Sequence, residues 1–209
     1  MNSQTMRICI FGASITWGAW DPENFGWAGR LRKFLETNKK YEDIEVYNLA
    51  ISGTTTRDLI KTIKLECDAI KPNIIVIAIG TNDASYINSK ENFWTDFKKF
   101  KSNINKLIKI TKKLDSKTIF LGITNVDEKR TMPSFFEENL NGYLYYSNSN
   151  IEKYNSAIEK ICQKEKISFI QVFGMLNDNE FEDGLHPNSK GHEKMFQKIK
   201  YFLISNRII

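Results

Sequence analysis

Two short segments near opposite ends of the chain hold residue types that could act as a nucleophile and a base. Ser14 follows an apolar run that ends at Phe11, and a serine in a strand-to-helix turn can expose its hydroxyl. The chain has only two histidines, and His186 follows Asp183 by three residues across a turn that contains Gly184. This spacing allows the carboxylate to return to the ring Nδ1 and to leave Nε2 as a base. Each segment alone also fits a structural role, as a helix N-cap or a capping turn.

Two further loops carry groups that could stabilise a negative charge. Gly53 lies in NLAISGTTTRDL after the second apolar run, and Asn82 lies in IAIGTNDASY after the third. Alone, Asn82 also fits a turn that binds its own backbone. However, the carboxyl ends of parallel strands meet at one edge of a sheet, where open α/β sheets place their ligand sites. The N–H groups of Ser14 and Gly53 and the amide of Asn82 would then serve as oxyanion donors, and Asp183 and His186 would complete an acyl-transfer site.

The rest of the chain alternates between strand and helix patterns. Apolar runs predict five strands, at residues 8–11, 44–49, 74–79, 118–123 and 168–172. Amphipathic segments predict helices at about residues 27–37, 56–70, 91–114, 151–166 and 189–204. One of the threonines at 54–56 can cap the second helix. This order predicts a single α/β domain over residues 1–209, a three-layer α/β/α sandwich with a five-stranded, mainly parallel sheet.

Aromatic side chains cluster near the proposed nucleophile and in one long connection. Residues 125–150 form a connection rich in aromatic residues, and long connections in compact domains are often functional. We expect it to be a lid or insertion that walls the substrate site, with Phe135 and Tyr143 toward the substrate; an oligomer interface and local packing are the alternatives. Trp17 and Trp20 fit either the rim of an acyl or sugar pocket or simple packing. The second histidine, His192, is expected to be solvated or to cap the last helix.

Composition and charge exclude several classes of protein. The chain of 209 residues is 41% hydrophobic and 26% charged, as in a globular domain, and its longest apolar run is far short of the ~20 residues that span a bilayer. The net charge of +5 is mild and the lysine-rich third helix has the pattern of a solvated face, so no nucleic-acid partner is expected. The three cysteines form no C-x-x-C pair, and the N-terminus has no secretory pattern. These features predict reduced buried thiols, no metal site and a cytoplasmic protein.

The four polar segments together resemble the sequence blocks of the SGNH (GDSL-type) hydrolase family. They are GAS at residues 12–14, the glycine at 53, GTND at 80–83 and DGLH at 183–186, in the family's order over nearly the whole chain. The resemblance implies a flavodoxin-like sandwich, esterase or lipase chemistry and no cofactor. On the matching positions it implies a nucleophile, a base, its acidic partner and two oxyanion donors, which are Ser14, His186, Asp183, Gly53 and Asn82 respectively. One position departs from the family pattern: Ala13 stands where the family usually has Asp, so the turn at Ser14 lacks a hydrogen bond that the Asp would offer.

These observations predict a serine esterase or acylhydrolase that forms an acyl-enzyme on Ser14. No long apolar stretch indicates a deep acyl tunnel, so short acyl esters are expected, with acetylated sugars and lysophospholipids both compatible with the site. The oligomeric state is left open, and Asp83 and Asp178 are rivals to Asp183 as the partner of the histidine.

Three alternatives to an active serine esterase of this family remain at this point. One is a flavodoxin-like module that binds a phosphate or nucleotide, although both glycine-rich phosphate motifs are missing. Another is an α/β-hydrolase, which would need G-x-S-x-G, whereas Thr16 takes the place of the second glycine. The third is a family member that binds ligands without turnover because Ala13 replaces the Asp.

Overall fold

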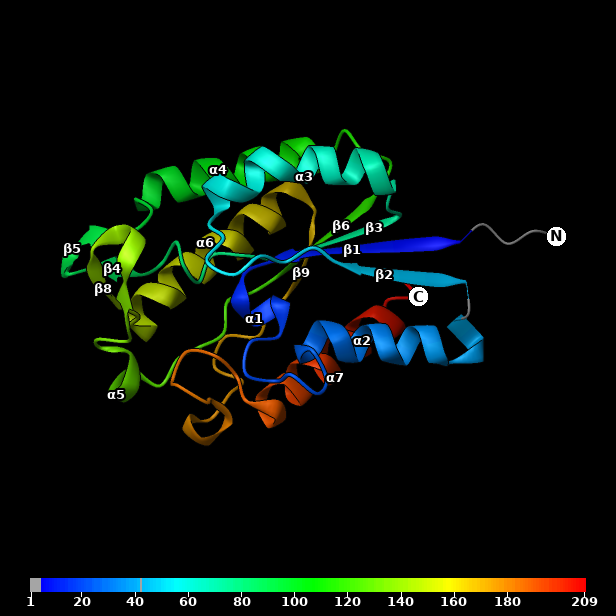
Figure 1. Ribbon diagram of the computed structural model, residues 1–209. Coiled ribbons are helices and arrows are strands. Elements are labelled where there is room, and N and C mark those ends of the chain that lie inside the picture. The colour runs from blue at the N-terminus through cyan, green and yellow to red at the C-terminus, as the bar shows by residue number, and fades with distance from the viewer. Residues whose placement is uncertain (1–4, 42) are drawn as a thin grey trace.

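The computed structural model describes residues 5–41 and 43–209, which are arranged in three layers (Figure 1). The middle layer is a sheet of five parallel strands in the order β2-β1-β3-β6-β9. The strands are β1 (Met6–Gly12), β2 (Ile44–Asn48), β3 (Ile74–Ala78), β6 (Lys117–Leu121) and β9 (Ser168–Ile170). All five lie where the sequence predicts strands. The order reverses between β1 and β3, which is the position where flavodoxin-like sheets open a ligand crevice.

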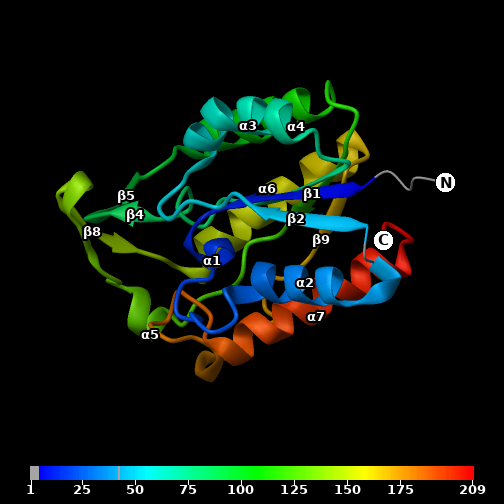
Figure 2. The ribbon, with the colours of Figure 1, turned by 45° about the vertical axis from the view of Figure 1, so that its right-hand side comes forward.

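Helices cover both faces of this sheet, as Figures 1 and 2 show from two directions. One face carries α3 (Thr56–Ile70), α4 (Phe97–Thr111) and α6 (Asn148–Glu165), and the other carries α2 (Gly26–Thr37) and α7 (Ser189–Ser205). Successive residues of β1 alternate between the two resulting cores: Cys9 and Phe11 pack beneath α3, and Ile8 and Ile10 pack against α2. The predicted α/β/α sandwich is therefore confirmed.

The third predicted helix, residues 91–114, is wrong at its start. α4 begins only at Phe97, because the carboxylate of Asp96 caps it and accepts two backbone hydrogen bonds of 2.9 and 3.1 Å from the first turn. The preceding segment is the strand β5 (Ser89–Phe93). Phe93 continues the helical spacing of the apolar residues but packs on Tyr86, with ring centroids 5.0 Å apart. Because Phe93 fits the helical spacing by chance, the sequence pattern predicted a helix where β5 lies.

A second, antiparallel sheet lies beside the carboxyl ends of the parallel strands, at the left in Figure 1. Its order is β5-β4-β8-β7, and the remaining strands are β4 (Tyr86–Ile87), β7 (Phe136–Glu137) and β8 (Gly142–Tyr145). The connection 125–150 is thus not a plain loop. It contains α5 (Glu128–Thr131), β7, the 3-10 turn Glu138–Leu140 and β8, and it runs into the start of α6.

The loops between strands and helices are closed by side-chain caps. α3 begins with a capping box in which Thr55 binds the backbone N–H of Asp58 and the Asp58 carboxylate binds the N–H of Thr55. This confirms the predicted threonine cap and holds the loop that carries Gly53. Ser147 caps α6 by accepting the N–H of Asn150, so this helix begins at Asn148, three residues before the predicted start. Two further 3-10 turns span Lys39–Tyr41 and Asp178–Glu180.

The cysteines are buried thiols, as the sequence predicts. All three cysteines are buried and unpaired, and burial raises the thiol pKa to about 12 for Cys9, about 11 for Cys67 and about 12 for Cys162. Within residues 5–41 and 43–209, no helix combines the length and apolarity that a membrane crossing requires. Residues 1–4, part of the N-terminal segment that was expected to lack a secretory pattern, lie outside the described residues.

Candidate active site

Ser14 is the first residue of the one-turn helix α1 (Ser14–Trp17), directly after β1. The N-cap is Ala13, which has extended backbone, makes no side-chain cap and is only 9% exposed within the apolar core. Backbone bonds hold the turn instead: the N–H of Trp17 donates to the Ala13 carbonyl at 2.9 Å, and the N–H of Gly18 donates to the Ser14 carbonyl at 3.0 Å. The turn therefore keeps its shape with an apolar residue where the family usually has Asp.

Ser14, His186 and Asp183 form one continuous chain of hydrogen bonds. The hydroxyl Oγ of Ser14 lies 2.9 Å from Nε2 of His186, and Nδ1 of the same ring lies 2.7 Å from Oδ2 of Asp183. The histidine side chain is 12% exposed, so the pair is largely shielded from water but reachable. A carboxylate at Nδ1 fixes the tautomer that leaves Nε2 as an acceptor for the serine proton.

The carboxylate of Asp183 accepts four hydrogen bonds. Oδ1 accepts from the backbone N–H groups of Leu185 at 2.9 Å and His186 at 2.8 Å, and Oδ2 accepts from the His186 ring and from Nε1 of Trp20 at 3.0 Å. Partial burial alone would raise the pKa of this carboxyl, but the bonds from His186 and Leu185 outweigh it and hold the pKa well below its usual range. Asp183 is therefore ionised at neutral pH. The bond from Trp20 was not predicted, because the two residues are 163 positions apart.

The turn from Asp183 to His186 is held by the segment 125–150. Arg130 donates to the backbone carbonyls of Glu182 at 2.8 Å and Asp178 at 2.9 Å, and the Asp127 N–H donates to the Gly184 carbonyl at 2.8 Å. Gly184 has φ 93°, and a Cβ there would lie 2.7 Å from Cβ of Arg130. The close approach therefore requires glycine.

The two rival carboxylates lie away from the histidine. Asp83 is fully buried and accepts hydrogen bonds from the N–H and hydroxyl of Thr56, at 2.9 and 2.6 Å. Burial raises its pKa, and the bonds from Thr56 offset only part of that effect. Asp178 is 66% exposed and faces Lys129 at 3.7 Å. Asp183 is thus the carboxylate that contacts the ring.

The predicted oxyanion donors lie on loops that hydrogen bonds join to each other and to β1. The N–H of Ile51 donates to the Gly12 carbonyl at 3.2 Å, and Nδ2 of Asn82 donates to the Thr54 carbonyl at 3.0 Å. Asn82 keeps a second amide hydrogen for another acceptor. Within the described part of the chain, the N–H groups of Ser14 and Gly53 have no protein acceptor. Three N–H donors are therefore available on these linked loops.

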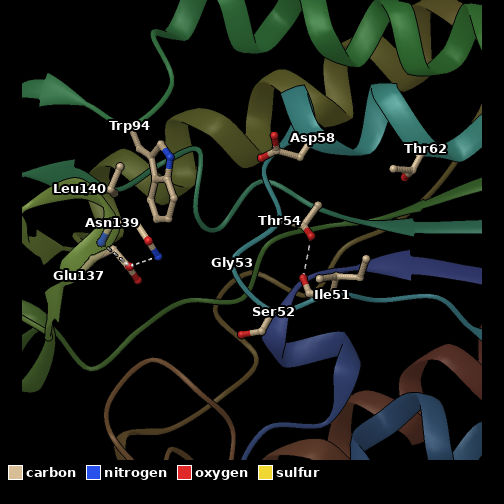
Figure 3. Close-up of a pocket in the computed structure, with 10 residues that line it drawn as sticks. All are labelled: Ile51, Ser52, Gly53, Thr54, Asp58, Thr62, Trp94, Glu137, Asn139 and Leu140. Carbon is tan, nitrogen blue, oxygen red and sulfur yellow. Dashed lines mark hydrogen bonds between the residues drawn. The ribbon is translucent and has the colours of Figure 1, made fainter.

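A cleft of about 480 Å³ begins at the Gly53 loop. Figure 3 shows residues 51–54 on one side and Trp94 with Leu140 on the other, with Asp58 above them. Glu137 and Asn139 complete the wall, and the Glu137 carboxylate accepts a hydrogen bond of 2.9 Å from the Asn139 amide. The cleft is thus lined by one indole ring, short aliphatic groups and several polar side chains.

The predicted aromatic pocket residues have other positions. Trp17, Phe135 and Tyr143 are 58%, 40% and 49% exposed and do not line this cleft. Tyr143 instead meets Phe136 edge to face, with ring centroids 5.2 Å apart. Trp20 is 59% exposed, and its indole nitrogen contacts Asp183 as described above. Segment 125–150 contributes three other residues to the lining of the cleft, Glu137, Asn139 and Leu140.

The expectation that His192 is solvated or caps a helix is wrong. The side chain is fully buried, its Nδ1 accepts the N–H of Trp27 at 3.3 Å, and its Nε2 lies 3.2 Å from the Ala19 carbonyl. Burial lowers its pKa to about 4, so the ring is neutral and Nε2 donates. These hydrogen bonds join the connection between α1 and α2 to α7.

In the described ranges, no group of three or more metal-ligating side chains is assembled.

Several known proteins resemble this chain in sequence and in fold. The chain is 25% identical to an isoamyl acetate-hydrolysing esterase of Saccharomyces cerevisiae, over 94% of this chain and 87% of the relative. Its fold matches that of the acetylxylan esterase Axe2 of Geobacillus stearothermophilus, with a TM-score of 0.71 at 18% identity over 96% and 95% of the two chains. It also matches the esterase EstA of Pseudoalteromonas sp., with a TM-score of 0.69 at 19% identity over 94% and 98%. The model of the GDSL-like lipase/acylhydrolase family matches residues 10–194, and the chain therefore belongs to this family of ester-bond hydrolases.

Proposed function

We propose that the protein cleaves carboxylic esters of short acyl groups through an acyl-enzyme on Ser14. The observation that carries this proposal is the hydrogen-bond chain from Ser14 Oγ through His186 to Asp183, at 2.9 and 2.7 Å. A nucleophile bonded to a base, with the base bonded to an orienting carboxylate, is the arrangement that activates a serine hydroxyl at neutral pH.

The reaction follows from these contacts. As Ser14 Oγ attacks the ester carbonyl, His186 Nε2 takes its proton, and the ionised Asp183 stabilises the resulting imidazolium. The N–H groups of Ser14 and Gly53 and the amide of Asn82 bind the oxyanion of the tetrahedral intermediate. The imidazolium then gives its proton to the leaving alcohol. Water repeats the sequence on the acyl-enzyme and releases the acid.

The residues that line the cleft favour esters with small acyl groups and polar alcohols. The cleft beside Gly53 has no long apolar wall, and Trp94 is the only aromatic residue among those that line it. Glu137 and Asn139 offer hydrogen bonds to hydroxyl groups. The names of the yeast relative and of Axe2 both refer to acetate esters, which accords with a short acyl group. We assign the cleft to the alcohol part of the ester and the segment 125–150 to its wall.

Replacement of the nucleophile tests the proposal. Ser14→Ala is expected to abolish hydrolysis of p-nitrophenyl acetate and covalent labelling by a fluorophosphonate probe, whereas Ser102→Ala, at an exposed serine on α4, keeps both. Wild-type turnover by Ser14→Ala would overturn the proposal. Wild-type protein that neither reacts with the probe nor hydrolyses esters would instead be a binding protein without turnover.

A further inference from the structure

Trp20 has an unusual position for a tryptophan. The residue is 59% exposed and has a left-handed backbone with φ 64°, a conformation that bulky residues rarely adopt. A tryptophan kept for packing would bury its ring. The one hydrogen bond of its side chain runs from Nε1 to Asp183 Oδ2, at 3.0 Å. The same oxygen accepts the His186 ring.

The segment that carries Trp20 is fixed on both sides. Immediately before it, the carbonyl of Ala19 accepts the hydrogen bond of the buried His192 ring. Immediately after it, Asp21 forms a buried ion pair with Arg30, and Arg30 also donates to Ser189 Oγ at 2.8 Å. The anchors on both sides of Trp20 thus tie it to α2 and α7. These contacts fix the backbone from which the Trp20 indole reaches the carboxylate.

We propose that Trp20 is a positioning residue that acts on the reaction through Asp183. Its N–H binds one lone pair of Asp183 Oδ2, so that the other lone pair of the same oxygen accepts the hydrogen bond of the His186 ring. This inference depends on the proposed function of Ser14 and His186. It gives Trp20 a role other than the two that the sequence left open, a pocket rim or packing.

The hydrogen bond from Trp20 also changes how strongly the Asp183 carboxylate attracts a proton on the His186 ring. A donor to the carboxylate shares its negative charge and weakens its pull on a proton at the ring. Without the indole N–H, Asp183 would hold the imidazolium form of His186 more strongly. The other titratable groups around this turn include the exposed Glu182, Arg130, which is paired with Asp127, and the buried, neutral side chains of His192 and Tyr146. Since none of them changes with the indole, the effect of its removal can be measured separately.

Trp20→Phe keeps an aromatic ring but removes the N–H together with the five-membered part of the indole. We expect kcat to fall roughly three- to tenfold with KM unchanged, a part of the 10²–10⁴ that general acid–base catalysis contributes. We also expect the acidic limb of the kcat/KM profile to move to higher pH. The matched control is Tyr201→Phe, which removes a polar group from a 72% exposed aromatic on α7 and should change neither quantity.

Nuclear magnetic resonance tests the bond without relying on turnover. In Asp183→Asn, the Trp20 indole N–H resonance should move upfield while the other tryptophan indoles stay in place. An unmoved resonance, or Trp20→Phe kinetics equal to those of Tyr201→Phe, would overturn the proposal. A rise in KM at constant kcat would also overturn it and would assign the ring to substrate contact. These outcomes are distinct from a failure of the proposed function, which Ser14→Ala alone reveals.

Discussion

The amide nitrogen of Asn82 donates a hydrogen bond of 3.0 Å to the carbonyl oxygen of Thr54. This bond joins the loop after β3 to the loop after β2, which carries Gly53. The next residue, Asp83, strengthens the link because it accepts both the N–H and the hydroxyl of Thr56. The two loops therefore form one unit before any substrate arrives, which is the condition for oxyanion stabilisation without reorganisation.

Gly53→Ala should separate the function of this glycine from its conformational cost. Gly53 and Gly174 have φ 77° and 76°, and no atom lies within 4 Å of a Cβ built on either. Alanine in this left-handed region costs about 1–2 kcal/mol at both positions. Both variants should lose similar stability in urea unfolding, but only Gly53→Ala should lose kcat, by about tenfold or more, because its N–H is displaced. Equal kcat values in the two variants would remove Gly53 from the oxyanion site.

Asn82→Ala should lower kcat by about 10²–10³ and change KM little, because the lost amide acts on the oxyanion rather than on the bound ester. Steady-state kinetics with p-nitrophenyl acetate measure the effect. Asn155→Ala is the control, since Asn155 is also a buried amide with internal hydrogen bonds, to the Ile123 N–H and to Gln171. If both variants lost kcat equally, the effect of Asn82 would be structural.

The buried His192 should make the fold sensitive to mild acid. Its pKa falls from 6.5 to about 4 on folding, so between these values the unfolded chain binds a proton that the native protein does not. The free energy of unfolding should therefore decrease as the pH falls through this window, by about 2 kcal/mol between pH 7 and pH 5. Urea unfolding at several pH values measures it.

His192→Gln supplies the comparison, because glutamine offers a donor and an acceptor but does not titrate. Carboxylates near their ordinary pKa titrate below pH 5 and contribute little to this window. The variant should lose most of the pH dependence between pH 7 and pH 5. A variant with the full wild-type dependence would show that another group is responsible.

The parallel sheet and its helices were predictable because each buries a continuous or periodic apolar face. The apolar run 74–79 and the apolar spacing of α3 leave few alternatives. The second sheet was not predictable, because strands of two to five residues such as β4 and β7 show no period. Their pairing joins segments that are far apart in the sequence, as β4 and β8 are. The extent of the domain and the cytoplasmic location stay predictions.

The site was predictable as far as residue type and strand ends determine it. Ser14, Asp183 and His186 lie together as their positions after parallel strands indicate. The bond from Trp20 to Asp183 and the burial of His192 were not predicted, because contacts between segments more than 160 positions apart leave no local pattern. Tyr143 shows the same limit: it alternates with the buried Leu144 on β8, so its ring lies outside.

Ser14 and His186 are 172 positions apart, so under the proposed mechanism turnover requires both ends of the chain to be folded together. A nascent chain that has not yet released the segment around His186, or a fragment cut anywhere between the two, has a serine without a base. Such species cannot hydrolyse esters, however well their own strands have formed. Hydrolytic rate per molecule would therefore count the molecules in which the two segments have met, and a refolding experiment followed by turnover would report when they meet.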